Sequence, residues 1–334
     1  MIAWGENPGN KLRLEDMLTR LAAISGVQCT ENIPLSRVTR FAIGGPARIL
    51  ADASSEAALI AAWDAIRGDP RTFIGGGTNL VADDRGFPGV VLRYTANNIE
   101  IDGQVVRVSA GAILQDLVDA SIAAGLEGLH TMTGIPGWVG GAIYGNAGAY
   151  GHSIHEFVES VRFFDGSRVR EIGNAACEFQ YRESVFKHHR RMHEDWIVLE
   201  TTLRLPQGDP AQLRATAEGI LKIRSEKYPP TMRCAGSIFK NLILAELPDN
   251  VRSQVPERVV REGKVPSAYF LELAGAKGMV LGGVQVADYH ANLIYNAGGG
   301  TSQQVRELIE TLKRRVEDRC GLLLEEEVQY VSCL

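Results

Sequence analysis

The sequence has few cysteines, and their spacing gives them no joint role. The five cysteines are odd in number and scattered, and no two form a C-x-x-C pair. A disulfide framework or a zinc site needs paired or clustered cysteines, so we predict neither, and we expect no resident metal. The pattern favours a reducing compartment. These residues are Cys29, Cys177, Cys234, Cys320 and Cys333.

Long apolar runs and blocks of one charge are missing as well. No apolar run approaches the ~20 residues of a membrane span, and the N-terminus lacks the charged-then-apolar order of a signal peptide. The 35 basic and 40 acidic residues give a net charge of −5 with no basic block. Nucleic acid is therefore not expected as a partner. We expect a cytoplasmic protein that is neither exported nor inserted in a membrane.

The two commonest nucleotide-binding fingerprints are also absent. No G-x-G-x-x-G follows a predicted strand, and no G-x-x-x-x-G-K-[ST] occurs. A Rossmann dehydrogenase or a P-loop enzyme is thus disfavoured. A pair of glycine-rich turns remains, and such turns can present backbone N–H groups to a pyrophosphate by another route.

The larger of these turns is the stretch 133–151, TGIPGWVGGAIYGNAGAYG, in which seven of nineteen residues are glycine. It is too apolar to be a solvated linker. Glycine concentrates where backbone passes close to other backbone or to a ligand, so a buried structural turn and a binding loop are both open. The smaller turn is 75–79, GGGTN. Two such turns suggest one extended ligand held at two places.

Apolar periodicity, caps and turn residues predict the secondary structure. Helices are expected at 11–24, 56–66, 113–124, 210–226, 268–274 and 303–319. Strands are expected at 47–53, 71–74, 89–93, 196–205, 280–286, 293–295 and 327–331, with hairpins over 99–110 and 158–172. Because strands and helices mix without strict βαβ alternation, the fold class is α+β. The Tyr228-Pro229-Pro230 break indicates a domain boundary in this chain of 334 residues.

Three polar segments stand out: YRESVFK (181–187), CAGSIFKN (234–241) and LEEEV (324–328). Singly, each has an ordinary explanation, such as a surface ion pair, a turn serine or a solvated strand edge. Together with the two glycine turns, and in this order, they resemble the UDP-N-acetylenolpyruvoylglucosamine reductases. The resemblance runs from about residue 39 to residue 331, and GIPGxVGGA with AGSxFKN is its specific part.

The resemblance implies a flavoenzyme of peptidoglycan precursor synthesis that reduces an enol ether with NADPH and non-covalent FAD. It implies a two-part FAD-binding domain of the vanillyl-alcohol-oxidase type (1–97 and 98–226), followed by an α+β substrate domain (227–334). A monomer is expected, of the subtype with a short interval between Arg182 and Ser237. The implied FAD contacts are Gly75, Gly76, Gly77, Thr78, Asn79, Ile135, Gly140, Gly141 and Ala142.

Three residues match the family's catalytic positions. Arg182 corresponds to the arginine that stabilises charge on the substrate carboxylate, and a planar guanidinium suits that anion. Ser237 corresponds to the group that protonates the carbanionic carbon, and Glu327 to the catalytic glutamate. Glu325 and Glu326 are expected to be solvated neighbours. The implied contacts to the UDP-sugar substrate are Tyr150, Lys227, Asn241, Lys277 and His290.

The sequence departs from the family pattern at two positions, and two rival functions stay open. Gln329 and Ala42 stand where many members carry a basic residue, which puts substrate or FAD affinity in question. A flavin oxidase of the same fold is the nearer rival, but no histidine that could tether flavin lies between Met1 and Leu129. A non-catalytic UDP-sugar-binding module is the other. It would not need Arg182, Ser237 and Glu327 together.

Overall fold

The computed structural model describes residues 8–332, and these divide into two compact units. The first comprises residues up to 33, 47–76 and 88–226, and the second comprises 34–46, 77–87 and the chain from 227 onward. The sequence assigned 34–46 and 77–87 to the first FAD-binding subdomain, so the structure groups these two segments differently. Both belong with the C-terminal residues because they pack in the same hydrophobic core, through Phe41, Ile43 and Val81.

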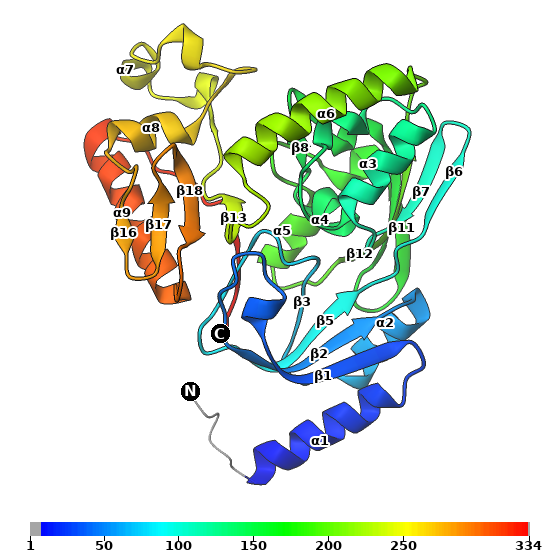
Figure 1. Cartoon of the computed structure of the whole chain (residues 1–334). Helices are drawn as coiled ribbons and strands as arrows, with labels where there is room; N and C mark the ends of the chain where they lie inside the picture. The colour runs from blue at the N-terminus through cyan, green and yellow to red at the C-terminus, as the bar shows by residue number, and fades with distance from the viewer. Residues whose placement is uncertain (1–7, 333–334) are drawn as a thin grey trace. The chain divides into compact units, whose positions relative to one another are not determined.

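The first unit holds two sheets. One has the strand order β1-β2-β5-β3 and the other β11-β10-β12-β7-β6 (Figure 1). The first sheet consists of β1 (Val27–Pro34), β2 (Pro46–Ala53), β3 (Arg71–Phe73) and β5 (Phe87–Tyr94). The second consists of β6 (Ile99–Asp102), β7 (Val105–Ser109), β10 (Val158–Phe164), β11 (Val169–Gly173) and β12 (Ile197–Arg204). One continuous core of buried side chains joins them.

The helices of the first unit begin and end at local signals. Ser55 accepts a hydrogen bond from the backbone N–H of Ala58 (3.2 Å) and so caps α2, as its position in the sequence predicts. Gly125, at φ +69°, follows the end of α3. These helices are α1 (Pro8–Ala22), α2 (Glu56–Ala65), α3 (Leu114–Ala123), α4 (Val139–Tyr144), α5 (Val185–Arg191) and α6 (Pro210–Lys227), with a small hairpin of β8 (Gly148–Ala149) and β9 (His152–Ser153).

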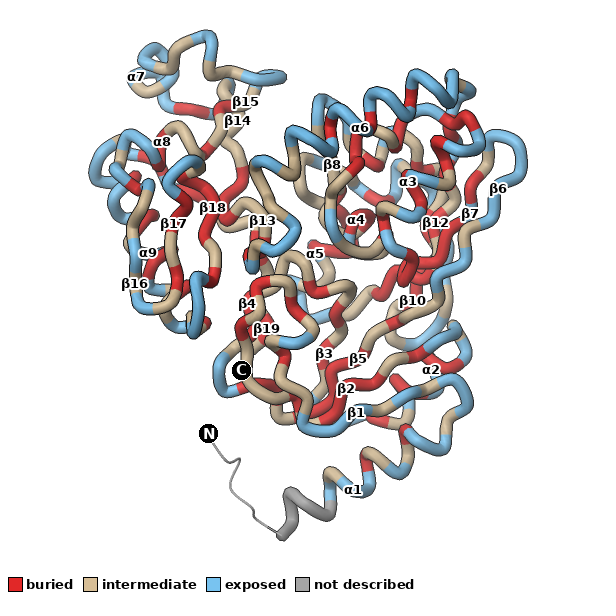
Figure 2. Tube along the Cα trace, viewed as in Figure 1, coloured by how far each residue is buried: buried red, intermediate tan, exposed pale blue. Residues whose placement is uncertain are grey.

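The second unit is built on an antiparallel sheet of order β13-β18-β17-β16, against which α8 packs (Figure 1). Figure 2 shows the unit's core as buried runs along β17 and β18. A parallel pair, β4 with β19, joins segments from distant parts of the sequence. The elements are β4 (Leu80–Ala82), β13 (Cys234–Ser237), β14 (Leu242–Ile243), β15 (Lys264–Val265), β16 (Val280–Leu281), β17 (Val284–Ala287), β18 (His290–Asn296), β19 (Gln329–Val331), α7 (Asp249–Arg252), α8 (Ser267–Leu273) and α9 (Ser302–Cys320).

Most predicted elements are confirmed, with two exceptions. The single strand expected over 280–286 is a hairpin of β16 and β17 that turns at Gly282-Gly283. Helix α4 lies within the glycine-rich stretch, where no helix was predicted. Its glycines have low helix propensity, and it is held instead by tertiary hydrogen bonds such as Gly140 N–H to Ala110 O (2.8 Å). Among residues 8–332, no helix is long and apolar enough to cross a bilayer.

Candidate active site

Ser237 ends strand β13 at an irregularity of the second unit's sheet. The register of β13 against β18 shifts between Cys234, opposite Tyr295, and Ser237, opposite Leu293. Gly236 lies inside this shift at φ +76°, a conformation that favours glycine. The bulge therefore sets the direction in which the Ser237 side chain leaves the strand. Its hydroxyl lies 3.2 Å from the hydroxyl of Tyr228.

A buried asparagine holds the loop that follows Ser237. The Asn292 side chain accepts from the Phe239 N–H (2.9 Å) and donates to the Phe239 carbonyl (2.8 Å) and to the Ser267 hydroxyl (2.7 Å). Only 3% of Asn292 is exposed, so these bonds are sheltered from water and costly to leave unmade. Asn241 accepts from the Ser267 N–H (3.3 Å) in the same loop.

Glu327 lies beside this loop. Its N–H donates to the Ile238 carbonyl (2.7 Å), directly after Ser237, and its carbonyl accepts from the Asn79 side-chain amide (3.0 Å). The Asn79 carbonyl in turn accepts from the Gln329 N–H (3.0 Å). The second unit thus brings together two of the predicted catalytic residues, and it ties them to the end of the first glycine turn.

Of the two glutamates before Glu327, Glu325 is solvated as the sequence predicted, with its side chain 61% exposed, whereas Glu326 is not. Glu325 forms an ion pair with the buried Lys240 (2.6 Å). Glu326, whose side chain is 19% exposed, pairs with Lys313 and also accepts from the Tyr330 hydroxyl. The sequence pattern of three consecutive acids could not reveal these partners, because they come from distant positions. Both pairs fix the backbone on the N-terminal side of Glu327.

Cationic side chains gather around His290 in the second unit. Burial and the charges of Lys227 and Lys277 lower the pKa of His290 to about 4. Its Nδ1 accepts a hydrogen bond from the Asn292 N–H (3.2 Å), which a protonated ring could not do. The imidazole is therefore neutral at pH 7 and carries its proton on Nε2. Three of the predicted substrate contacts thus share one electropositive region.

Removing His290 should flatten the dependence of stability on pH. The folded-state pKa is depressed, so the unfolded chain binds a proton between pH 6.5 and 4 where the folded chain does not. The stabilisation is present above pH 6.5 and is lost as pH falls to about 4. One pKa unit is about 1.4 kcal/mol, so the loss is on the order of 3 kcal/mol. Urea unfolding at pH 4.5 and 7.5 should show His290→Gln losing less stability than the unchanged protein; equal losses would contradict the assignment.

Arg182 belongs to the first unit, where its side chain joins the segment 181–187 to the glycine-rich stretch. Its Nη2 donates to the Gly148 carbonyl (2.8 Å) and its Nη1 to the Asn146 carbonyl (3.3 Å), both within the glycine-rich stretch. Its own backbone has φ +59°, a conformation uncommon for a residue with a side chain. The Lys187 ammonium donates to the Arg182 carbonyl (2.8 Å) and supports this geometry. A strained arginine held from two sides is typical of a functional position.

The glycines of the two turns differ in what surrounds them. A Cβ built on Gly76 would lie 2.9 Å from the Trp138 ring, and one on Gly140 would lie 2.9 Å from Ala110 Cβ. Gly77 is likewise closed off by the backbone of Val38. These three glycines serve close packing within the protein. By contrast, a Cβ at Gly75 or at Gly141 would meet no atom within 4 Å, so only these two leave space for a bound group.

The remaining predicted contacts differ in exposure. Tyr150 is 47% exposed, at φ +53° in the turn between β8 and β9. Ala142 as a whole is 5% exposed in the core, so only a small part of the residue could contact a ligand. Ile135 is partly buried against the same core, and Thr78 is partly buried beside Asn79 in the second unit.

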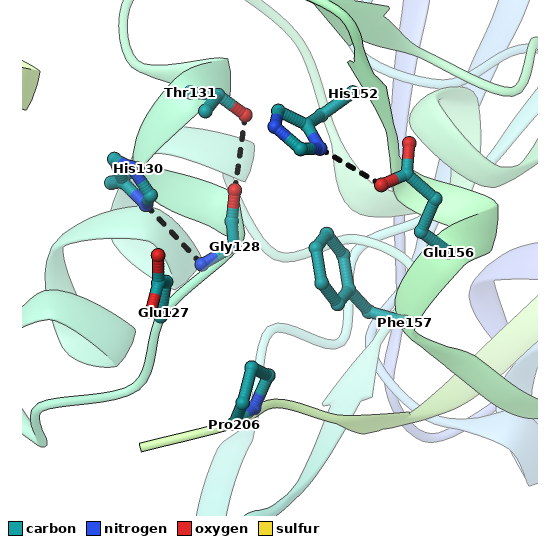
Figure 3. Close-up of a pocket in the computed structure, with 8 residues that line it drawn as sticks. All are labelled: Glu127, Gly128, His130, Thr131, His152, Glu156, Phe157 and Pro206. Atoms are coloured by element: carbon teal, nitrogen blue, oxygen red, sulfur yellow. Dashed lines mark hydrogen bonds and ion pairs between the residues drawn. The ribbon is translucent and has the colours of Figure 1, made fainter. Parts of the chain in front are cut away.

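A cavity of about 320 Å³ opens elsewhere in the first unit, and none of the predicted site residues lines it (Figure 3). His152 bonds to Glu156 (2.9 Å) on one side, and His130 Nδ1 accepts from the Gly128 N–H (3.2 Å) on the other. Residues 8–332 contain no group of three or more histidines, cysteines or acids that could hold a metal. The lining residues are Glu127, Gly128, His130, Thr131, His152, Glu156, Phe157 and Pro206.

Comparisons with known proteins identify the family. Residues 47–168 match the family described as FAD binding domain, and residues 228–331 match UDP-N-acetylenolpyruvoylglucosamine reductase, C-terminal domain. The UDP-N-acetylenolpyruvoylglucosamine reductase of Solibacter usitatus is 54% identical over 315 residues, 94% of this chain and 100% of that protein. This chain belongs to the UDP-N-acetylenolpyruvoylglucosamine reductase family.

More distant members of the family also match this chain in sequence and in structure. The reductase of Rubrobacter xylanophilus is 34% identical over 303 residues, 90% of this chain and 94% of that protein. The crystal structure of the Thermus caldophilus reductase superposes with a TM-score of 0.71 at 26% identity, covering 92% of this chain and 99% of that one. The α+β fold and the FAD-binding domain predicted from sequence are confirmed.

The structure accounts locally for the two departures from the family pattern. The Gln329 amide donates to the carbonyls of Glu327 (3.3 Å) and Val328 (3.2 Å), so it folds back on its own strand. Ala42 has φ +54°, and its carbonyl accepts from the Asn296 side chain (3.1 Å). Each residue thus has a structural role at its position in the second unit.

The sequence analysis did not single out two residues that shape the candidate site around Ser237, Tyr228 and Asn292. Tyr228 was read only as part of a Tyr-Pro-Pro break. Asn292 follows His290 in YHAN and drew no attention of its own. A polar side chain within an apolar strand pattern such as ANLIY is the one sequence signal that could have singled out Asn292.

Proposed function

We propose that this chain reduces UDP-N-acetyl-enolpyruvoylglucosamine to UDP-N-acetylmuramate with NADPH and non-covalent FAD, as a cytoplasmic step of peptidoglycan precursor synthesis. The observation that carries the proposal is how firmly the loop after Ser237 is held. The bulged strand β13, the buried Asn292 side chain and the Glu327 backbone all contact it. A serine at the end of a bulged strand, followed by a loop that is held at Ile238 and Phe239, suits a proton donor in a pre-organised site. The enzyme acts as a monomer of the shorter-loop subtype.

The residues of the two glycine turns suit a flat, extended cofactor. Gly75 and Gly141 leave space where any side chain would intrude, and Gly76, Gly77 and Gly140 shape the turns by packing. Bound FAD would supply the hydride-transfer chemistry between NADPH and the enolpyruvyl group. Thr78, Ile135 and the backbone of Ala142 line the path of the cofactor, and Asn79 links that path to Glu327. The FAD-binding domain expected over 1–97 and 98–226 would thus include two segments, 34–46 and 77–87, that pack in the core of the second unit.

The protein's own side chains stabilise the developing charge and supply the proton. Arg182 binds the substrate carboxylate and stabilises the negative charge that develops beside the reacting double bond. Ser237 donates its hydroxyl proton to the carbanionic carbon, and Glu327 orients the polarised substrate. Hydrogen bonds to two backbone carbonyls already orient the Arg182 guanidinium. Little rotamer entropy is therefore lost when substrate binds.

The electropositive region around His290 binds the anionic part of the UDP-sugar. Lys227 and Lys277 balance the diphosphate, and the neutral His290 offers its Nε2–H as a donor. Asn241 and Tyr150 contact the sugar and the nucleotide. Burial is the main cause of the low pKa of His290, and the charges of Lys227 and Lys277 lower it further; the same two charges attract an anion.

The test is an absorbance spectrum of the purified protein. Flavin bands should be present, NADPH should bleach them without oxygen, and the enolpyruvyl substrate should restore them. Denaturation should release all flavin into the supernatant, because no covalent tether holds it. Flavin that stays on the precipitated chain would favour an oxidase of the same fold. A protein that binds the UDP-sugar yet remains colourless after incubation with FAD would favour a non-catalytic module.

A further inference from the structure

The hydroxyl groups of Tyr228 and Ser237 lie within hydrogen-bond distance in the second unit. Tyr228 Oη and Ser237 Oγ are 3.2 Å apart, and either atom could donate. Tyr228 follows directly after α6, which ends at Lys227. It packs with Met232 and Tyr295 against the buried Cys234, three residues before Ser237. The contact joins two chemically active groups that the sequence gives no reason to pair.

The proposed chemistry decides which hydroxyl donates. A serine that protonates a substrate carbon must direct its own hydrogen at that carbon, so its oxygen is left as the acceptor toward Tyr228. As the proton leaves, negative charge builds on Ser237 Oγ, and a donor already in place stabilises it. An aliphatic alcohol is a very weak acid, whereas a phenol is a stronger one. The tyrosine is therefore suited to assist the serine.

We propose that Tyr228 is a positioning residue that donates a hydrogen bond to Ser237 Oγ and then returns a proton to it. The inference rests on the proposed function of Ser237. In the balanced step, the Ser237 O–H bond breaks as its proton forms a C–H bond with the substrate carbanion. The Tyr228 O–H proton moves to Ser237 Oγ, and the resulting phenolate takes a proton from water. No electrons are exchanged with any other group.

Two basic side chains lie near the Tyr228 ring. The Lys227 ammonium lies 5.2 Å from the centre of the Tyr228 ring, and the His290 ring centre lies 6.3 Å from it. Burial lowers the pKa of His290, and the charges of Lys227 and Lys277 add to that effect. A positive potential stabilises an anion, so the lysines that balance the substrate diphosphate also assist proton return through Tyr228.

The first test compares Tyr228→Phe with Tyr295→Phe. Both variants lose one phenolic hydroxyl in the same cluster, but the Tyr295 hydroxyl donates to Gln285 (2.9 Å). Tyr228→Phe should slow reoxidation of the reduced enzyme by substrate about 10- to 100-fold, below the full value of a general acid. Reduction by NADPH, substrate Kd and Tm should stay unchanged. Tyr295→Phe should leave reoxidation at the original rate, and equal rates for both variants would overturn the proposal.

A double-mutant cycle separates this inference from the proposed function. In the Ser237→Ala background, Tyr228→Phe should cause no further loss, because the group it assists is gone. If Ser237→Ala itself reoxidises at the original rate, the proposed role of Ser237 fails and the inference fails with it. If Ser237→Ala is slow while Tyr228→Phe is not, only the inference fails. Additive losses would likewise overturn it.

The second test needs neither substrate nor flavin turnover. In Ser237→Cys, a hydrogen bond from Tyr228 would stabilise the thiolate, so its alkylation rate should reach half-maximum at a lower pH than in Ser237→Cys/Tyr228→Phe. A hydrogen bond to a charged group is worth roughly 1.5–3 kcal/mol, so a shift of at least one pH unit is expected. Iodoacetamide labelling with peptide fragmentation distinguishes this thiol from Cys234. Superimposable profiles would overturn the hydrogen-bond assignment.

Discussion

Replacing Ser237 with alanine is expected to slow reoxidation of the reduced enzyme by substrate about 10²- to 10⁴-fold, the usual contribution of a general acid. The carbanionic carbon would have no positioned donor, while reduction by NADPH does not involve this group and should keep its rate. The change also removes the partner of the Tyr228 hydroxyl (3.2 Å), which is a small structural loss by comparison. Stopped-flow absorbance of the two half-reactions measures both rates.

A matched control shows whether the loss is chemical. Ser253→Ala also removes a serine hydroxyl from the second unit, one that donates to the Asn250 carbonyl (3.4 Å) on an exposed surface. It should leave both half-reactions unchanged. Small and equal losses in both half-reactions of Ser237→Ala would mean that the serine only shapes its turn. Reoxidation of that variant at the original rate would remove Ser237 from the proposed mechanism.

Replacing Gly141 with leucine is expected to lower the affinity for FAD by about 100-fold, while the chain stays folded. A Cβ at Gly141 meets no protein atom within 4 Å, so the larger side chain extends into the space proposed for the cofactor. Overpacking of a filled site costs about 1–3 kcal/mol, which corresponds to a loss of that size. The apoprotein should be at least as stable as before, because glycine is a poor helix former. Flavin content and Tm of the apoprotein are the measurements.

The best control is Gly219→Leu, since Gly219 is another helical glycine with no atom within 4 Å of a built Cβ. It should retain FAD fully. Gly76→Val would be a weaker test of the cofactor site. Its side chain would press on the Trp138 ring (2.9 Å to a Cβ), so lost flavin could follow from disturbed packing. Full flavin occupancy in Gly141→Leu would move the cofactor away from α4.

Much of the local structure could be predicted because its causes are local. Ser55 caps α2 with its own side chain, and Thr301 and Gln304 form a capping box at the start of α9. The turn signals Asp102-Gly103 and Asp165-Gly166 correctly predicted two hairpins. The motifs around Ser237 and Glu327 could likewise be recognised, because each consists of neighbouring residues in the sequence. For these features the sequence by itself was sufficient.

The tertiary structure alone decided which residues support the motifs. Tyr228, Asn292 and Glu327 come together around Ser237 through hydrogen bonds between distant parts of the chain. Periodicity and turn signals report the burial and conformation of neighbouring residues, and they carry no information on which distant strand a segment will join. The pairing of β4 with β19 shows the same limit, since it places 77–87 in the second unit.

The glycine-rich stretch 133–151 shows most clearly what the sequence determined and what the tertiary structure decided. Its composition determined that backbone must pass close to something, because glycine has no side chain to pack and a high entropy cost of folding. Only the tertiary structure decided what each glycine of this stretch and of the smaller turn 75–79 approaches. In the stretch this is Ala110 for Gly140 and open space for Gly141, and in the smaller turn it is Trp138 for Gly76 and open space for Gly75. The physical reason is that a missing Cβ permits any close approach equally. Which atoms come close to each glycine is decided when the chain folds.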